Sequence, residues 1–200
     1  MNYYLDITLL PDAEANLGFL WQKVFQQVHI ALVDNKVGDN ESAVALSVVG
    51  YQDKTFPLGN KLRLLAASED VLQKLDMQRW LNRLSDYCHL SSVKPVPASV
   101  KEYARFNRKN VKSIEKKAQR RATHLAKPYE EVLAYLIEED KSKACKLPFI
   151  NVESQDTKKR EGQGVSCQFL LFIEQTIFDE PKNGKFDCYG LSKTATVPWF

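Results

Sequence analysis

Two hydrophobic periods alternate along the first 94 residues in a fixed order, and that order restricts the fold more than any other feature of the sequence. Residues 3–9 alternate as a half-buried strand does, and from Leu17 to Leu32 apolar residues recur every three or four positions, as on an amphipathic helix. We expect further strands at residues 43–51, 61–68 and 87–93, and a second helix at residues 69–86 with Ser68 as its N-cap. The order strand, helix, strand, strand, helix, strand predicts an α+β fold with a ferredoxin-like domain, which is also the frame of the RNA recognition motif.

The pattern changes after residue 94. The stretch KPVPASV carries two prolines and is typical of a linker. Beyond it we expect an extended segment at residues 102–107, a basic helix at about 109–125, a second helix at 129–140, and strands at 148–154 and 166–175. These elements would form a smaller C-terminal α/β half, so we predict two domains, at residues 1–94 and 95–200.

The positive charge of the chain is concentrated in one segment. Residues 101–127 hold ten Lys or Arg against two acidic residues, a net charge of +8, although the whole chain carries only +3. The remainder is therefore mildly acidic, at −5. A basic block on such a body predicts a polyanionic partner that binds at one place.

The basic block maps to one face of the predicted helix. At about 100° per residue, the apolar residues gather on a thin side and the cations on the opposite side. The cationic residues are Lys109, Lys112, Lys116 and Arg120, flanked by Lys117 and Arg121. Such a helix could dock lightly and present its cations to a nucleic-acid groove, or it could be a solvated surface helix or one face of a coiled coil.

Arg105 and Asn107 precede the helix at positions i and i+2. On an extended backbone both side chains leave from the same face. Arg suits the edge of guanine and Asn suits the edge of adenine, so the pair could read two bases. The same residues also fit a plain edge strand.

Three other residues have both a structural and a chemical interpretation. His29 lies at the margin of the apolar stripe of the first helix, where a lone His is most often a packed or surface residue. Ser154 ends a predicted strand, where serine is an ordinary turn residue. Phe169 alternates with Leu171 and Ile173, so core packing is the default, whereas an RNA-binding sheet would use the ring as a stacking platform.

Several classes of site are not encoded. No stretch approaches the roughly 20 apolar residues of a membrane span, and residues 1–10 lack the features of a signal peptide, so we expect a cytoplasmic protein. The four cysteines form no C-x-x-C pair, which argues against a disulfide framework or a zinc site. The sequence also shows no glycine-rich phosphate loop and no cluster of His and carboxylates, so we expect no cofactor and no metal.

Four features of the sequence match one known family. YYLDITLLPD resembles the opening strand of that family, His29 falls where its helical histidine falls, and LPFINVESQ resembles the stretch with its active-site serine. The ending CYGLSKTATVPWF resembles its C-terminal signature almost residue for residue. The chain thus resembles the CRISPR repeat-processing endoribonuclease of the type I-F systems, with residues 35–100 matching mainly in pattern.

The resemblance implies a sequence- and structure-specific endoribonuclease that cleaves the repeat RNA at the base of a hairpin without metal and keeps hold of its product. The ribose 2′-hydroxyl would attack the adjacent phosphate, leaving a 2′,3′-cyclic phosphate and a 5′-hydroxyl. His29 would act as the base, Ser154 would hold the reacting ribose and Tyr189 would fix the imidazole. The C-terminal segment would fold back beside the first helix, where Trp199 and Phe200 would pack.

The resemblance also implies how RNA is bound. The basic helix would lie in the major groove of the hairpin, with Arg105 and Asn107 at the two base-reading positions ahead of it. The family has Gln where this chain has Asn107, which is one methylene shorter, and the helix here is mostly lysine, a point charge rather than a planar fork. We also assign Gln155, Phe169 and the basic loop at residues 156–164 to RNA contact.

The expected partners are the repeat hairpin RNA and the other subunits of a type I-F effector complex, with the free protein a monomer. Two other functions share the charge asymmetry. The protein could be a hairpin-binding subunit without catalytic activity, or a basic-helix protein that binds any nucleic acid. The last possibility leaves the C-terminal motif unexplained.

Overall fold

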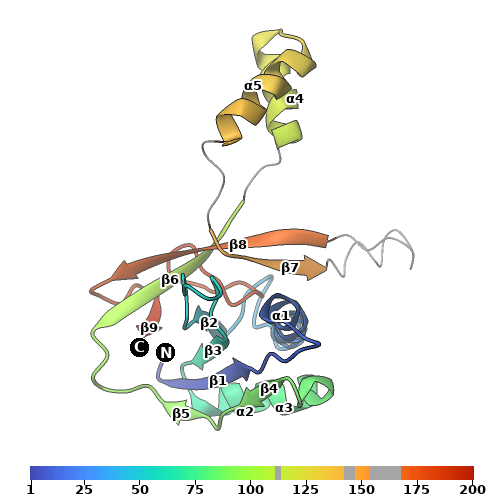
Figure 1. Ribbon diagram of the computed structural model, residues 1–200. Helices are drawn as coiled ribbons and strands as arrows, with labels where there is room; N and C mark the ends of the chain where they lie inside the picture. The colour runs from blue at the N-terminus through green and yellow to red at the C-terminus, as the bar shows by residue number, and fades with distance from the viewer. Residues whose placement is uncertain (111–113, 142–146, 154–167) are drawn as a thin grey trace. The chain divides into compact units, whose positions relative to one another are not determined.

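The computed structural model describes residues 1–110, 114–141, 147–153 and 168–200, although the side chains of residues 116, 140 and 141 are not part of the description. The chain forms two compact units (Figure 1). The first unit comprises residues 1–108 and 148–200, and the second comprises residues 109–147.

The first sheet follows the element order predicted for residues 1–94. Its strands are β1 (Tyr3–Leu9), β2 (Val44–Val48), β3 (Lys61–Ala66) and β4 (Cys88–Leu90), in the order β2-β3-β1-β4, and β5 (Lys94–Pro95) also pairs with β1. All of these pairs are antiparallel. Alternation buries Leu5 and Ile7 of β1, while Asp6 lies on the other face, opposite Arg63 of β3.

Helix α1 (Leu17–Asp34) is the element that positions the site. Asn16 begins it by accepting a hydrogen bond from the Phe19 N–H at 3.0 Å, as a helix N-cap does. Its predicted apolar stripe is buried, with Trp21 and Phe25 each about 1% exposed. In Figure 1 the helix lies between the first sheet and strand β7, which it contacts, so the stripe is covered from both sides.

The second sheet belongs to the same unit as the first. Its strands are β6 (Glu102–Lys109), β7 (Phe149–Glu153), β8 (Gln168–Phe178) and β9 (Val197–Trp199), in the order β7-β8-β6-β9. Inward side chains of this sheet, such as Phe106, Ile150 and Ile173, join the hydrophobic core of the first sheet. The predicted α+β class is therefore confirmed, while the division of the chain differs from a boundary at residues 94 and 95 because one core spans both sheets.

The helix predicted at residues 69–86 is interrupted. It consists of α2 (Glu69–Leu75), α3 (Met77–Trp80) and the 3-10 turn η1 (Asn82–Leu84). Asp76 separates the first two, with a left-handed φ of 48°, and its side chain accepts a hydrogen bond from the Arg79 N–H at 3.4 Å. Ser68 occupies the N-cap position of α2 but makes no capping hydrogen bond. An aspartate that tolerates the left-handed region thus splits the predicted helix.

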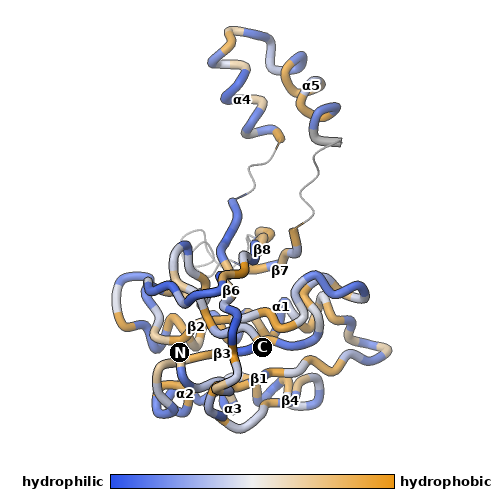
Figure 2. The backbone as a smooth tube through the Cα atoms, turned by 90° about the vertical axis from the view of Figure 1, so that its left-hand side faces the viewer, coloured by the Kyte–Doolittle hydropathy of each residue, from blue (hydrophilic) through white to orange (hydrophobic). Residues whose placement is uncertain are grey.

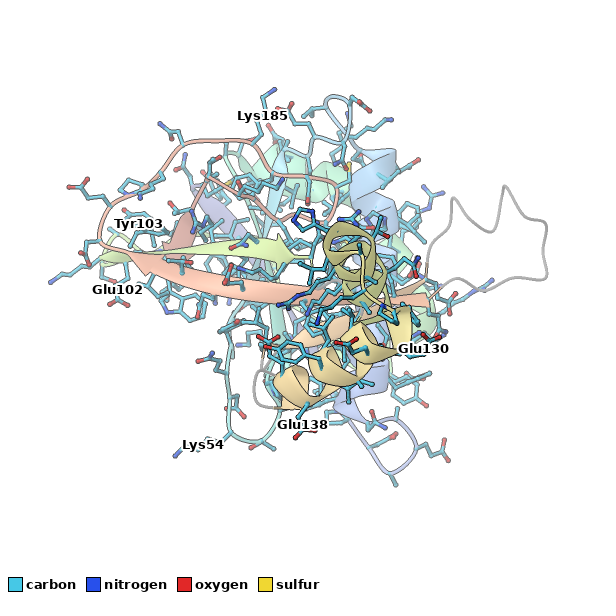
Figure 3. All side chains as sticks on the ribbon, turned by 90° about the horizontal axis from the view of Figure 1, so that it is seen from above. Lys54, Glu102, Tyr103, Glu130, Glu138 and Lys185 are labelled. Atoms are coloured by element: carbon cyan, nitrogen blue, oxygen red, sulfur yellow. The ribbon has the colours of Figure 1, made fainter. Side chains whose placement is uncertain are left out.

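The second unit is a helix pair. Helix α4 (Ile114–Leu125) begins at Ile114 rather than near residue 109, because Lys109 still belongs to β6. Helix α5 (Tyr129–Lys141) packs on it through Ala118, Ala122, Val132 and Leu136. The tube of α4 is largely hydrophilic (Figure 2), whereas Glu130 and Glu138 project from α5 (Figure 3). A basic helix therefore packs against an acidic one.

The terminal aromatic rings pack on the sheets. Strand β9 pairs with β6 at the edge of the second sheet, and an edge strand tolerates a proline such as Pro198, which has no N–H to donate to the ladder. The Phe200 ring centroid is 3.9 Å from the guanidinium carbon of Arg63, and the Phe200 carbonyl accepts a hydrogen bond from the same side chain at 2.8 Å. The Trp199 ring lies 5.8 Å from that of Phe106. These contacts place the two rings on the sheets, and Tyr189 is the C-terminal aromatic residue that lies beside the first helix.

Candidate active site

His29 on α1 stacks directly on Tyr189 from the C-terminal segment. The two ring centroids are 4.1 Å apart and the planes differ by 6°. Phe25, one helical turn before His29, is parallel to the same tyrosine, with centroids 6.2 Å apart and planes 4° apart. The stack joins the first helix to the C-terminal segment, so two of the three residues predicted to be catalytic lie together.

A hydrogen bond fixes the orientation of the imidazole. His29 Nδ1 lies 2.8 Å from the carbonyl oxygen of Cys188. Because a carbonyl oxygen only accepts, Nδ1 carries the proton and the lone pair of the neutral ring is on Nε2. This is the tautomer of a base that takes up a proton at Nε2.

A tight turn at residues 187–190 holds Tyr189 against the histidine. Asp187 Oδ1 accepts hydrogen bonds from the N–H groups of Tyr189 at 2.9 Å and Leu191 at 3.0 Å. Gly190 has a φ of 73°, and a Cβ at this position would lie 2.7 Å from Cβ of Leu46. The Gly190 carbonyl also accepts a hydrogen bond from the Leu46 N–H at 2.8 Å, so the turn is docked on β2 and requires glycine.

Asp187 brings a half-buried carboxyl group to the stack. Burial raises the pKa of this carboxyl above its ordinary value of 3.8. The N–H groups of Leu191 and Tyr189, the charge of His29 when it is protonated, and the charge of Arg108 lower the pKa but do not outweigh burial. The carboxylate form is therefore less favourable in the folded protein than in the unfolded chain.

We expect Asp187→Asn to increase the free energy of unfolding at neutral pH, and the increase should shrink as the pH falls. The raised folded-state pKa means that the ionised carboxyl lowers stability above that pKa, and that this loss disappears below 3.8, where the group is protonated in both states. Asn keeps an oxygen for the two N–H groups. Urea unfolding of both proteins at about pH 7 and about pH 4 measures the difference, and a variant whose relative stability is lowest at neutral pH would contradict the expected sign.

Arg108 is a residue of the site that the sequence prediction missed. Its guanidinium carbon is 5.0 Å from the ring centroid of Phe169 and 5.9 Å from that of Tyr189. The sequence does contain a signal for it, because alternation along β6 puts Arg108 on the face opposite Arg105 and Asn107. Phe106, two residues earlier on the same face, is buried, whereas Arg108 is exposed near the end of the strand.

Arg105 lies on the other face of β6 and is held by its own protein. It donates hydrogen bonds to Thr176 Oγ1 at 3.3 Å and to the Lys193 carbonyl at 3.2 Å, and its guanidinium carbon lies 5.2 Å from the Phe178 ring centroid. Its Nε is buried without a hydrogen-bond partner among the described residues. The side chain is therefore pre-positioned, and reading a base would use its remaining donor capacity.

Asn107 is held in a similar way. Its Nδ2 donates to Glu174 Oε2 at 3.1 Å, while its Oδ1 is buried and has no partner in the described part of the chain. A buried polar oxygen of this kind usually pairs with water or a ligand. Arg105 and Asn107 thus leave from one face of β6, as predicted from their spacing.

The predicted RNA-binding cations of the helix pair differ in their surroundings. Arg120 is exposed on α4. Arg121 lies 3.6 Å from the carboxylate of Glu139 and its guanidinium carbon is 5.3 Å from the Tyr135 ring centroid, both on α5. Lys117, which like Arg120 and Arg121 lies on α4, is half-buried. The acidic helix α5 therefore contacts Arg121, one of the cations that the sequence predicts to bind RNA.

Several predicted site residues lie outside the described residues. They are Ser154, Gln155, the loop at 156–164, Lys112 and the side chain of Lys116. Glu153, the last described residue before Ser154, donates its N–H to Gln26 Oε1 at 3.3 Å. Because Gln26 lies three residues before His29, this bond ties the end of β7 to the part of α1 that carries the candidate base.

The described residues form neither a metal site nor a membrane-spanning helix. They contain no group of three or more His, Cys, Asp or Glu side chains arranged to hold a metal ion. None of the described helices is long and apolar enough to cross a membrane.

The chain matches known proteins over its full length. The family described as CRISPR-associated protein (Cas_Csy4) matches residues 4–200. The chain is 32% identical to the CRISPR-associated endonuclease Cas6/Csy4 of Escherichia coli (strain UTI89 / UPEC) and 33% identical to the protein of the same name from Pseudomonas aeruginosa (strain UCBPP-PA14), over 100% of each chain. The resemblance inferred from the motifs and the prediction of an endonuclease are therefore confirmed. The chain belongs to the CRISPR-associated Cas_Csy4 family.

Proposed function

We propose that the protein is a metal-independent endoribonuclease that cleaves CRISPR repeat RNA at the base of a hairpin and remains bound to the product. The observation that carries this proposal is the fixed imidazole of His29, bonded through Nδ1 to the Cys188 carbonyl and stacked on Tyr189. A base that is already oriented, with its lone pair on Nε2, is what removal of a ribose 2′-proton requires. The endonuclease names of both relatives support the reaction class.

The chemistry follows from that base. His29 Nε2 accepts the proton of the 2′-hydroxyl while the 2′-oxygen forms a bond to the adjacent phosphorus. The bond between phosphorus and the 5′-oxygen breaks, and the 5′-oxygen takes up a proton. The products are a 2′,3′-cyclic phosphate and a 5′-hydroxyl. Ser154 holds the reacting ribose and Tyr189 keeps the imidazole in place, while the nucleophile comes from the RNA itself, so no metal-bound water is needed.

The helix pair supplies the affinity for RNA. The phosphates of the hairpin stem are contacted by the cations of α4, which include Lys116 and Lys117, and by Lys109 and Lys112 ahead of it. Gln155 and Phe169 contact RNA nearer the reacting nucleotide. Phosphate contacts dominate affinity and do not depend on the bond that is cut, so the product hairpin stays bound. In the cell, the free protein is a cytoplasmic monomer, and other subunits of a type I-F effector complex join the RNA that it retains.

One experiment tests the proposal against a hairpin-binding subunit without catalytic activity. The purified protein is incubated in EDTA with repeat RNA that contains the palindrome, with the same RNA carrying one 2′-deoxyribose at the cleavage site, and with a scrambled stem. Cutting of the first RNA alone, with a cyclic phosphate end, supports the proposal. Tight binding of the palindromic RNA without cutting, with or without added divalent metal, would show the binding subunit instead.

Two arginines are expected to act differently on binding. Arg120→Ala should weaken binding to all hairpins about equally and reduce the salt dependence by about one counterion. Arg105→Ala should instead reduce discrimination at one base pair, by about 1–3 kcal/mol. Affinities for cognate and mutated hairpins at two salt concentrations separate the two effects, with Lys74→Ala on α2 as the control for loss of an exposed cation. Equal weakening of cognate and mutated hairpins by Arg105→Ala would remove its base-reading role.

A further inference from the structure

Arg108 lies beside the catalytic stack and is not used by the mechanism above. It stands near the end of β6, exposed, with its guanidinium carbon 5.0 Å from the Phe169 ring centroid and 5.9 Å from the Tyr189 ring centroid. Phe169 comes from β8 and Tyr189 from the C-terminal turn, so two separate segments supply the rings. A cation near two aromatic rings loses part of its conformational freedom before any ligand arrives.

The donors of this guanidinium are not used by the described part of the protein. No described residue forms a hydrogen bond with the side chain of Arg108, and no described carboxylate lies within the 4.0 Å of an ion pair with it. Arg105, three positions earlier, shows the contrast, because its two terminal nitrogens donate to Lys193 and Thr176. Arg108 therefore has five N–H donors in a planar fork, a geometry that suits the oxygens of a phosphate.

The position of Arg108 relative to His29 limits which phosphate it can reach. The Tyr189 ring is 4.1 Å from the imidazole centroid and 5.9 Å from the guanidinium carbon, so the base and the cation are no more than about 10 Å apart. A ribose together with its 3′-phosphate is large enough to touch both groups. Asp187, which interacts electrostatically with both groups, is bonded to the N–H groups of its own turn through Oδ1.

We propose that Arg108 is a catalytic residue that binds a non-bridging oxygen of the scissile phosphate while His29 takes the 2′-proton. This inference rests on the proposed ribonuclease function and adds to it the group that stabilises developing charge. As the 2′-oxygen bonds to phosphorus, negative charge grows on the non-bridging oxygens before the bond to the 5′-oxygen breaks. A fixed guanidinium stabilises that charge without itself giving up a proton.

The test uses Arg108→Gln and Arg108→Lys in the full-length protein, with Lys54→Ala as the control. Lys54 lies on an exposed loop at the periphery of the molecule (Figure 3). Single-turnover cleavage of the repeat hairpin is measured at saturating protein, and affinity is measured with the uncleavable 2′-deoxy hairpin. We expect Arg108→Gln to cleave about 100-fold more slowly, to bind the deoxy hairpin less than about tenfold more weakly, and to be partly rescued by Lys, which keeps the charge.

Two further measurements separate catalysis from structure. The NMR signals of the His29 ring report its stack on Tyr189, and they should be unchanged in Arg108→Gln. If they shift as far as in an unstacked Tyr189→Ala reference, the arginine acts only by holding the tyrosine and the inference is wrong. A wild-type cleavage rate in Arg108→Gln, or a deficit that disappears at higher protein concentration, also overturns it. Failure of the wild-type protein itself to cut the hairpin would overturn the proposed function instead, so the two failures are distinguishable.

Discussion

His29→Ala is expected to slow single-turnover cleavage of the repeat hairpin by about 10²–10⁴-fold. The substitution removes the group that we propose to accept the 2′-proton, while the helix pair that we propose to contact the phosphates is unchanged. Affinity for an uncleavable 2′-deoxy hairpin should therefore remain close to that of the wild-type protein. Quenched-flow cleavage and a filter-binding titration on the same preparation measure both quantities.

Variants of the other two proposed catalytic residues serve as controls for this result. Tyr189→Phe keeps the ring that lies 4.1 Å from the imidazole, so it should have the mildest effect of the three. Ser154→Ala should slow the chemical step, because the reacting ribose is held less well. An unaltered cleavage rate in His29→Ala would remove the assignment of the base, whatever the other variants show.

Deletion of residues 198–200 is expected to produce the largest loss of stability. It removes β9 from the edge of the second sheet, together with the rings of Trp199 and Phe200. Arg63, which is 6% exposed, would lose the ring 3.9 Å from its guanidinium carbon and one hydrogen bond. At about 25 cal/mol per Å² of apolar surface, we expect a loss of about 3–6 kcal/mol, or a melting temperature lower by about 10 °C or more.

The same deletion separates stability from catalysis. The sequence alone predicts that both are lost together, because the tail was expected to pack beside the first helix. The structure holds Tyr189 through the turn at 187–190 and through the Ser192 N–H, which donates to the Phe106 carbonyl at 2.9 Å. We therefore expect the truncated protein to cleave at nearly the wild-type rate per folded molecule at low temperature. A melting temperature equal to that of the intact protein would mean that β9 contributes little to the fold.

Phe200→Leu is the matched control for the deletion. It keeps the strand pairing of β9 and an apolar side chain but loses the aromatic face on Arg63. Its melting temperature should lie between those of the intact and truncated proteins, because a cation–π contact with a partly desolvated arginine contributes only about 1–2 kcal/mol. A Phe200→Leu protein as unstable as the truncation would assign the whole effect to the ring.

Elements with a strong local signal could be predicted from the sequence. Helix α1 has an apolar stripe, an Asn cap at residue 16 and an ending at Asp34, and all three are local. The break at Asp76 was missed, although the sequence carries a signal for it: at about 100° per residue Leu81 falls on the side opposite Leu72, so the apolar stripe does not continue across Asp76. Strand β9 was missed because Pro198 argues against a strand unless its edge position is known.

The site shows the same division between local and long-range information. The pairing of His29 with Tyr189 was expected from a family resemblance, since nothing local connects positions so far apart in the chain. Arg108 could be assigned to a face of β6 by alternation, but its two ring contacts depend on β8 and on the C-terminal turn. The partners of Arg121 on α5 could not be predicted either, because the charge pattern of α4 does not show which helix covers it.

The hydrogen bond between His29 and Cys188 also sets an order of events during synthesis. The two residues are 159 positions apart, so a ribosome adding about 5–20 residues per second makes them roughly 8–30 s apart. Once residue 125 has been added, the nascent chain contains the basic helix but still lacks the turn that fixes the imidazole. Until β7 has been added, the apolar surface of α1 that it covers is also open, which is the kind of surface that chaperones bind. If the basic helix binds RNA and His29 is the base, as we propose, a nascent chain can hold RNA before it can cut it, and cutting begins only after the C-terminal segment has left the ribosome.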